Sequence, residues 1–152
     1  MAHEIKLINL QDQPVLVVRD TLPVEKLPEF FGRAYGNIMA YLAQLGEQPT
    51  GMPFGAYYNL DMSALDVAAG FPVAKKLPDK EKIQSQVIPG GDFITTIHYG
   101  AYDSVSPAYD ALAQWAKANH REATGTAYEY YLNDPSSDPS IIPETEIRIP
   151  LK

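Results

Sequence analysis

The chain of 152 residues contains no cysteine. That absence excludes disulfides, a thiol nucleophile and thiolate metal ligands. The three histidines, at positions 3, 98 and 120, lack metal-ligand spacing. No apolar run is long enough to cross a membrane, and Glu4 and Lys6 stand where a signal peptide needs its apolar stretch. We therefore expect a cytoplasmic protein that uses no metal or other cofactor.

Positive charge is also scarce. Lys and Arg number 12 against 19 Asp and Glu, which gives a formal net charge of −7. Binding to a phosphate backbone requires clustered Lys and Arg, and only KKLPDKEK at 75–82 is locally dense. Direct binding of nucleic acid is therefore not expected.

The remaining composition is that of an average soluble globular protein, with 45% hydrophobic and 20% charged residues. The length suits one domain with a real core. We therefore expect residues 1–152 to form a single domain.

The order of the expected elements repeats along the chain. Alternating β-branched and aromatic residues predict strands, and apolar residues recurring every three to four positions predict helices. The expected order is strand, helix, strand, strand in each half: 14–22, 25–45, 52–60 and 63–74, then 91–102, 104–120, 126–132 and 144–151. Gly46 is expected to end the first helix. GAYYNLD at 55–61 also resembles AYEYYLND at 127–134.

This internal repeat predicts an α+β fold made of a duplicated β-α-β-β module. The halves, about 1–78 and 83–152 by even division of the chain, would be related by a pseudo-twofold axis and joined by LPDKEKIQ at 77–84. Such a module lays its helices on one face of an antiparallel sheet. The other face would then form a ligand cleft between the halves.

Glu129 is unusual, because strands are depleted in glutamate. Alternation places Glu129 and Tyr131 on one face of their strand and Tyr128 and Tyr130 on the other. If the helices cover the second pair, Glu129 points into the cleft. The alternatives are a solvated strand residue and a cross-strand partner of Arg148.

At this point the sequence resembles a known family. The segments VLVVRD, HYGAYDSV and YEYYLNDP followed by TEIRIPL are similar to the GyrI-like small-molecule-binding domain, the effector-binding module of AraC-type and MerR-type bacterial multidrug regulators. The resemblance implies an aromatic cleft with a glutamate at its base that pairs with lipophilic cations. That glutamate corresponds to Glu129. No helix-turn-helix precedes the first strand, so a stand-alone member is expected.

Aromatic rings attract cations through their faces, so tyrosines are the natural walls of such a cleft. Trp115 rides on a helix and is interpreted as core packing. The residues expected to bind ligand are Glu129, Tyr131, Tyr57, Tyr58, Phe71, Tyr99 and Tyr102.

The resulting function is binding or sequestration of small hydrophobic, cationic aromatic compounds. The family resemblance leaves two alternatives: a DNA gyrase inhibitor-like interaction module, and a hydrolase of strained, cyclopropane-bearing natural products. A hydrolase would use Glu129 as acid or base, with Asp103, Glu144 or Glu146 as the second group. No motif marks a nucleophile, so turnover is not expected. Besides gyrase, a second copy of the chain is the other alternative partner, through an exposed strand edge.

Overall fold

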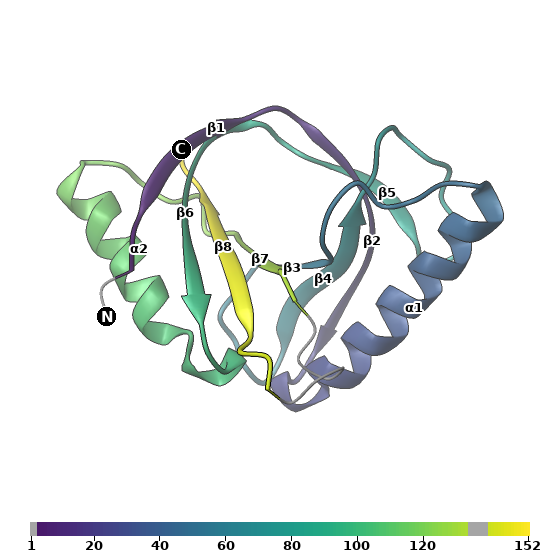
Figure 1. Cartoon of the computed structure of the whole chain (residues 1–152), viewed down its shortest axis with the longest axis horizontal. Coiled ribbons are helices and arrows are strands. Elements are labelled where there is room, and N and C mark those ends of the chain that lie inside the picture. Colours follow the sequence, from purple (N-terminus) through teal and green to yellow (C-terminus); the bar gives the residue numbers. More distant parts are fainter. Residues whose placement is uncertain (1–2, 134–139) are drawn as a thin grey trace. The chain divides into compact units, whose positions relative to one another are not determined.

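The computed structural model describes residues 3–133 and 140–152, so residues 134–139 of the YEYYLNDP motif and of the turn after it lie outside the described part. The chain divides into two compact units. The α1 unit is Gln11–Gly90, and the α2 unit is the segment ending at Leu10 together with Gly91–Lys152. Figure 1 shows each long helix beside strands of its own unit.

The α1 unit contains β2 (Gln13–Leu22), a 3-10 turn η1 (Val24–Lys26), α1 (Leu27–Leu45), β3 (Phe54–Tyr57), β4 (Leu65–Pro72) and β5 (Gln84–Ile88). Its strands lie in the order β3-β4-β2-β5, and every neighbouring pair is antiparallel. Helix α1 ends where Gly46 adopts a left-handed conformation with φ 69°, as expected from the sequence.

The α2 unit contains β1 (Lys6–Leu10), β6 (Gly91–Tyr99), a 3-10 turn η2 (Tyr102–Ser104), α2 (Ser106–Ala118), β7 (Ala127–Tyr131) and β8 (Glu144–Pro150). Its strands lie in the order β1-β6-β8-β7, again with every neighbouring pair antiparallel. The α+β class and the duplicated β-α-β-β module predicted from the sequence are confirmed. None of the helices in the described residues has the length and apolar character needed to cross a membrane.

Strands β1 and β5 were not predicted. Each adds to the outer edge of the first strand of a module: β1 pairs with β6, and β5 pairs with β2. The segment ending at Leu10 therefore belongs with the second module, unlike the expected division near 78–83. Both strands are mostly exposed, so they lack the regular apolar alternation that marks a half-buried strand.

Each helix covers one face of its own sheet. In the α1 unit, Phe30 and Ala34 of the helix pack on Val67 and Ala69 of β4. In the α2 unit, the helix residues Ala108, Leu112 and Ala116 pack on Ile94, Ile147 and Ile149. Truncating a buried leucine such as Leu112 to alanine costs about 2–5 kcal/mol. These two contacts define the helix-covered face of each sheet.

Two asparagines occupy equivalent positions in the modules. Asn59 Nδ2 donates to the Ala64 carbonyl (3.1 Å), and its Oδ1 accepts from the Asp66 amide (2.9 Å). Asn133 makes the same pair of bonds, to the Ile142 carbonyl (2.8 Å) and from the Glu144 amide (3.0 Å). The strand registers then align the two modules residue by residue.

Candidate functional site

Glu129 lies on the helix-covered face of the α2 unit. It stands opposite Ile147 in the β7–β8 register, and Ile147 packs against α2. Residues directly opposite in an antiparallel pair share a face. Alternation correctly placed Glu129 and Tyr131 together, but the assumption that the helix covers Tyr128 and Tyr130 is wrong. Which face of β7 the helix covers depends on the pairing of β7 with β8, and the alternation within one strand does not reveal that pairing.

Two tyrosine hydroxyls hold the Glu129 carboxylate. The hydroxyl of Tyr109, on α2, donates to Oε2, and the hydroxyl of Tyr131 donates to Oε1 at 3.3 Å. Burial raises the pKa of Glu129 above its usual range, while the two hydroxyl bonds and the nearby His98 oppose the rise. Within the described residues, no Lys or Arg forms an ion pair with this carboxylate. The site therefore holds a partly buried acid that has no Lys or Arg partner in the described part of the chain.

Arg148 is not that partner. Its Nε donates to Glu146 at 2.8 Å, and its guanidinium lies 4.3 Å from the centroid of the Tyr130 ring. Arg148 stands opposite Tyr128 in the register, so it is on the face away from Glu129. The alternative of a Glu129–Arg148 pair is contradicted.

Tyr102 and His98 complete the surroundings of the carboxylate. The ring of Tyr102, on η2, lies edge-on to Tyr131 with centroids 5.5 Å apart. His98 is a buried residue of β6, and the ring of His3 stacks on it at 6.0 Å. Of the predicted ligand residues, the α2 unit thus brings together Glu129, Tyr131 and Tyr102.

Tyr99 does not join this group. It is 61% exposed and alternates with His98 along β6, so it lies on the opposite face. Trp115 is partly buried against the core beneath α2, in agreement with a packing role.

The three predicted residues of the α1 unit lie in different surroundings. Phe71 is 7% exposed and packs in the core, with the Tyr35 ring edge-on at 5.3 Å. Tyr57 also packs against the core beneath α1. The Arg19 guanidinium lies 3.9 Å from the centroid of the Tyr58 ring. The Phe71 ring contacts other core side chains on nearly all of its surface, so too little of it is exposed to form a wall of an open site in this structure.

Sequence reasoning missed Tyr109 as a site residue. Its ring packs against the core of the α2 unit, as expected of an aromatic residue on the apolar face of a helix. A buried tyrosine hydroxyl usually finds a hydrogen-bond partner, and that rule was the available signal. A carboxylate on the facing strand was the obvious candidate.

Two of the three acids considered as second catalytic groups, Glu144 and Glu146, do not reach Glu129. Glu146 is bonded to Arg148, and Glu144 accepts from Asn133 Nδ2 at 3.3 Å. Both alternate with Thr145 along β8, so they lie on the other face of the sheet. The side chain of Asp103 lies outside the described part. Within the described residues no three His, Asp or Glu side chains converge as donors for a metal ion.

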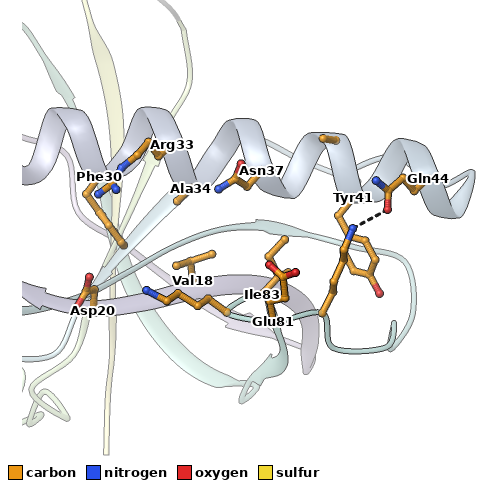
Figure 2. Close-up of a pocket in the computed structure, with 13 residues that line it drawn as sticks. Val18, Asp20, Phe30, Arg33, Ala34, Asn37, Tyr41, Gln44, Glu81 and Ile83 are labelled. Carbon is orange, nitrogen blue, oxygen red and sulfur yellow. Dashed lines mark hydrogen bonds between the residues drawn. The ribbon is translucent and has the colours of Figure 1, made fainter.

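A separate groove of about 530 Å³ lies in the α1 unit. Figure 2 shows Phe30 and Tyr41 pointing from α1 toward the strands below, and it marks the bond from Lys80 Nζ to Gln44 Oε1 (2.8 Å). None of the residues predicted to bind ligand lines it. Its walls carry both signs of charge, so charge selects no ligand class. The lining residues are Val18, Asp20, Phe30, Arg33, Ala34, Asn37, Ala40, Tyr41, Gln44, Lys80, Glu81, Lys82 and Ile83.

Solved structures show the same fold. The chain is 24% identical to the C-terminal domain of EcmrR, covering 100% of this chain and 99% of that one with a TM-score of 0.74. It is also 24% identical to EcmrR in a complex with DNA, with a TM-score of 0.79. That match includes 99% of this chain but only 57% of the EcmrR chain, so this chain spans little more than half the length of EcmrR.

Two more distant structures are similar over nearly the whole chain. A hydrolase from Listeria innocua is 13% identical, with a TM-score of 0.72 and coverage of 98% of this chain and 92% of that one. SAV2435 bound to tetraphenylphosphonium is 14% identical, with a TM-score of 0.67 and coverage of 98% and 94%. At these identities the likeness shows the fold alone.

No curated protein matches the chain in sequence. The family model that does match describes a GyrI-like small molecule binding domain, and it covers residues 3–152. That span contains both modules and the Glu129 site. The chain therefore belongs to the family of GyrI-like small-molecule-binding domains.

Proposed function

We propose that this domain binds or sequesters small hydrophobic cations, with Glu129 as their counter-charge. The observation that carries the proposal is the partly buried carboxylate held by Tyr109 and Tyr131, to which no Lys or Arg of the described residues is paired. Burying an acid without a cation is unfavourable, which is why its pKa is raised. A bound cation restores the missing charge interaction.

The tyrosines around the carboxylate suit an aromatic or lipophilic cation. Tyr102 is half-exposed and lies edge-on to Tyr131, whose hydroxyl donates to Glu129. A cation over a tyrosine face gains about 0.5–2 kcal/mol. Flat aromatic surfaces require little shape matching, which favours ligands of varied shape. SAV2435, which shares the fold, was solved with tetraphenylphosphonium, a ligand of this class.

Binding also has a local cost. The hydroxyl of Tyr109 belongs to α2, so a ligand that replaces this hydroxyl at Oε2 breaks a bond between helix and sheet. A hydrogen bond to a charged group contributes about 1.5–3 kcal/mol. The bond from Tyr131 to Oε1 is longer, at 3.3 Å, so Oε1 is the oxygen that a cation approaches with less loss.

The test compares a cation with a neutral compound of similar shape, methyltriphenylphosphonium and triphenylphosphine oxide, by isothermal titration calorimetry. Glu129→Gln should weaken the cation at least about tenfold and the neutral compound by less than about threefold, because tenfold corresponds to the roughly 1.4 kcal/mol expected of one desolvated charge contact. The matched control is Glu144→Gln, which removes the same charge on the opposite face of the sheet. Equal losses for both compounds in Glu129→Gln would contradict the proposal.

Hydrolysis is the second candidate function, favoured by one observation. An acid whose pKa is raised by burial and that contacts the Tyr109 hydroxyl has the properties of a general acid. The test incubates the protein with a cyclopropane-bearing electrophile and follows ring opening by mass spectrometry. Turnover that disappears in Glu129→Gln would support catalysis, and binding without turnover would leave sequestration as the function.

A further inference from the structure

Two buried polar atoms of the α2 unit have no hydrogen-bond partner among the described residues. They are Nδ1 of His98 and Oγ1 of Thr145, in residues that are 6% and 1% exposed. His98 stands opposite Thr145 in the β6–β8 register, and Thr145 stands opposite Tyr131 in the β7–β8 register. Both side chains therefore lie on the helix-covered face, beside the row that contains Glu129.

The surroundings of His98 determine which ring nitrogen carries the hydrogen. Nε2 lies 3.0 Å from the Ala101 carbonyl oxygen, which only accepts. It also lies 3.1 Å from Ser104 Oγ, whose own hydrogen is donated to the same carbonyl at 2.8 Å. Nε2 is therefore a donor, so Nδ1 of the neutral form of the ring is a bare acceptor. Thr145 Oγ1 has two unused lone pairs and one unused O–H, so both orphaned atoms can accept a hydrogen bond.

The fold does not require a hydroxyl at the position of Thr145. In the α1 unit, the register places Asp20, Val67 and Tyr57 in one row, where the α2 unit has His98, Thr145 and Tyr131. Val67 is the counterpart of Thr145, and it is 0% exposed and packs in the core. The same module therefore folds with an apolar valine at this position.

The same comparison applies to the carboxylate. Gly55 stands opposite Ala69 in the α1 unit, as Glu129 stands opposite Ile147 in the α2 unit. The carboxylate and the unpaired hydroxyl thus occur together in one module and are both missing from its counterpart. This asymmetry points to a ligand rather than to folding.

We propose that His98 Nδ1 and Thr145 Oγ1 act with Glu129 as an acceptor cluster that selects cations carrying an N–H donor. Protonated amines belong to this class, whereas quaternary ammonium and phosphonium ions do not. This inference rests on the proposed function and narrows its ligand class. A quaternary cation compensates the charge of Glu129 but leaves both acceptors without a hydrogen bond. A protonated amine compensates the same charge, and its N–H also donates a hydrogen bond to one of the acceptors.

The test uses two probes of equal charge, 2-(1-naphthyl)ethyl-dimethylammonium and its trimethylammonium counterpart, titrated at pH 7 by calorimetry. They differ by one N–H against one methyl group. The wild-type protein should prefer the dimethylammonium probe at least about tenfold, since hydrogen bonds to charged groups are the stronger class. Thr145→Val should reduce that preference to about threefold or less with the trimethylammonium affinity unchanged.

Two further variants separate selection from structure. Thr145→Ser keeps the hydroxyl and should retain the preference. Thr95→Val removes a buried hydroxyl on the opposite face that already donates to Glu146 at 3.0 Å, and it should also retain the preference. Equal affinity of the two probes for the wild type, or an unchanged preference in Thr145→Val, would overturn this inference alone. Failure of both probes to bind the wild type would overturn the proposed function as well.

Discussion

The bond between Tyr109 and Glu129 gives a prediction with a defined magnitude. Tyr109→Phe removes one hydroxyl and keeps the ring that packs against the core of the α2 unit. Hydrogen bonds to charged groups contribute about 1.5–3 kcal/mol and neutral ones about 0.5–1.5 kcal/mol. We therefore expect Tyr109→Phe to lower the free energy of unfolding at pH 7 by about 1.5–3 kcal/mol. In the Glu129→Gln background the loss should fall to about 0.5–1.5 kcal/mol.

The loss should also depend on pH. The Tyr109 bond holds the pKa of Glu129 down, so removing it raises that pKa further. The stabilisation by the hydroxyl is then fully present when Glu129 is ionised and becomes smaller as the pH falls and the carboxyl is protonated. Urea unfolding at pH 7 and pH 4, followed by circular dichroism with the m-value checked for constancy, measures both effects.

Tyr41→Phe is the matched control for this cycle. Its hydroxyl donates to the Pro78 carbonyl at 2.8 Å, which is a neutral acceptor. The loss should be about 0.5–1.5 kcal/mol and the same at both pH values. The loss of unfolding free energy caused by Tyr109→Phe could instead be the same, within about 0.5 kcal/mol, in the wild type and in Glu129→Gln and at both pH values. That result would refute a charged bond between the two side chains.

Three further predictions concern stability. Because the pKa of Glu129 is raised, the folded state binds its proton more tightly than the unfolded state, so this residue's contribution to stability decreases as pH rises from the usual carboxyl range through the raised pKa. Thermal unfolding across pH should therefore show a smaller decrease in Glu129→Gln, and identical pH profiles would contradict it. Glu81 has φ 53°, so Glu81→Gly should raise the free energy of unfolding by up to about 1 kcal/mol, and a loss of stability would refute this reading of the turn. A Cβ on Gly70 would lie 2.5 Å from a β2 carbonyl oxygen, so Gly70→Ala should cost about 1–3 kcal/mol in urea unfolding. The open helical position Gly36→Ala should instead gain about 0.5–1 kcal/mol, and similar effects at both glycines would contradict the argument from space.

The sequence predicted the elements that contain a strong pattern. Both long helices and the six strands of the repeated modules have apolar residues at the period of their structure, and each was found. Strands β1 and β5 lie at the outer edges of β6 and β2 and are mostly exposed. Edge strands need only one neighbour and little apolar surface, so their sequences KLINL and QSQVI contain a weak signal.

The site was predicted in part for a similar reason. Alternation placed Glu129 and Tyr131 on a common face, but the side that the helix covers depends on the pairing of β7 with β8. Tyr109 contacts Glu129, and Thr145 lies on the same face as Glu129, only through contacts and register between distant segments. Local pattern determines which residues share a face, and the tertiary fold determines what that face contacts.

The central claim is that the ionised Glu129 carboxylate is the counter-charge of a bound cation. The direct measurement is the affinity of methyltriphenylphosphonium as a function of pH, because this ligand keeps its charge throughout. The affinity of the wild type should increase as pH rises through the raised pKa of Glu129, since only the ionised acid attracts the cation. His3 and His98 are present in Glu129→Gln as well, so the difference between the two curves isolates Glu129. A clear increase in the wild type and a weak, flatter curve in Glu129→Gln is the predicted result, and parallel curves of equal affinity would contradict the account.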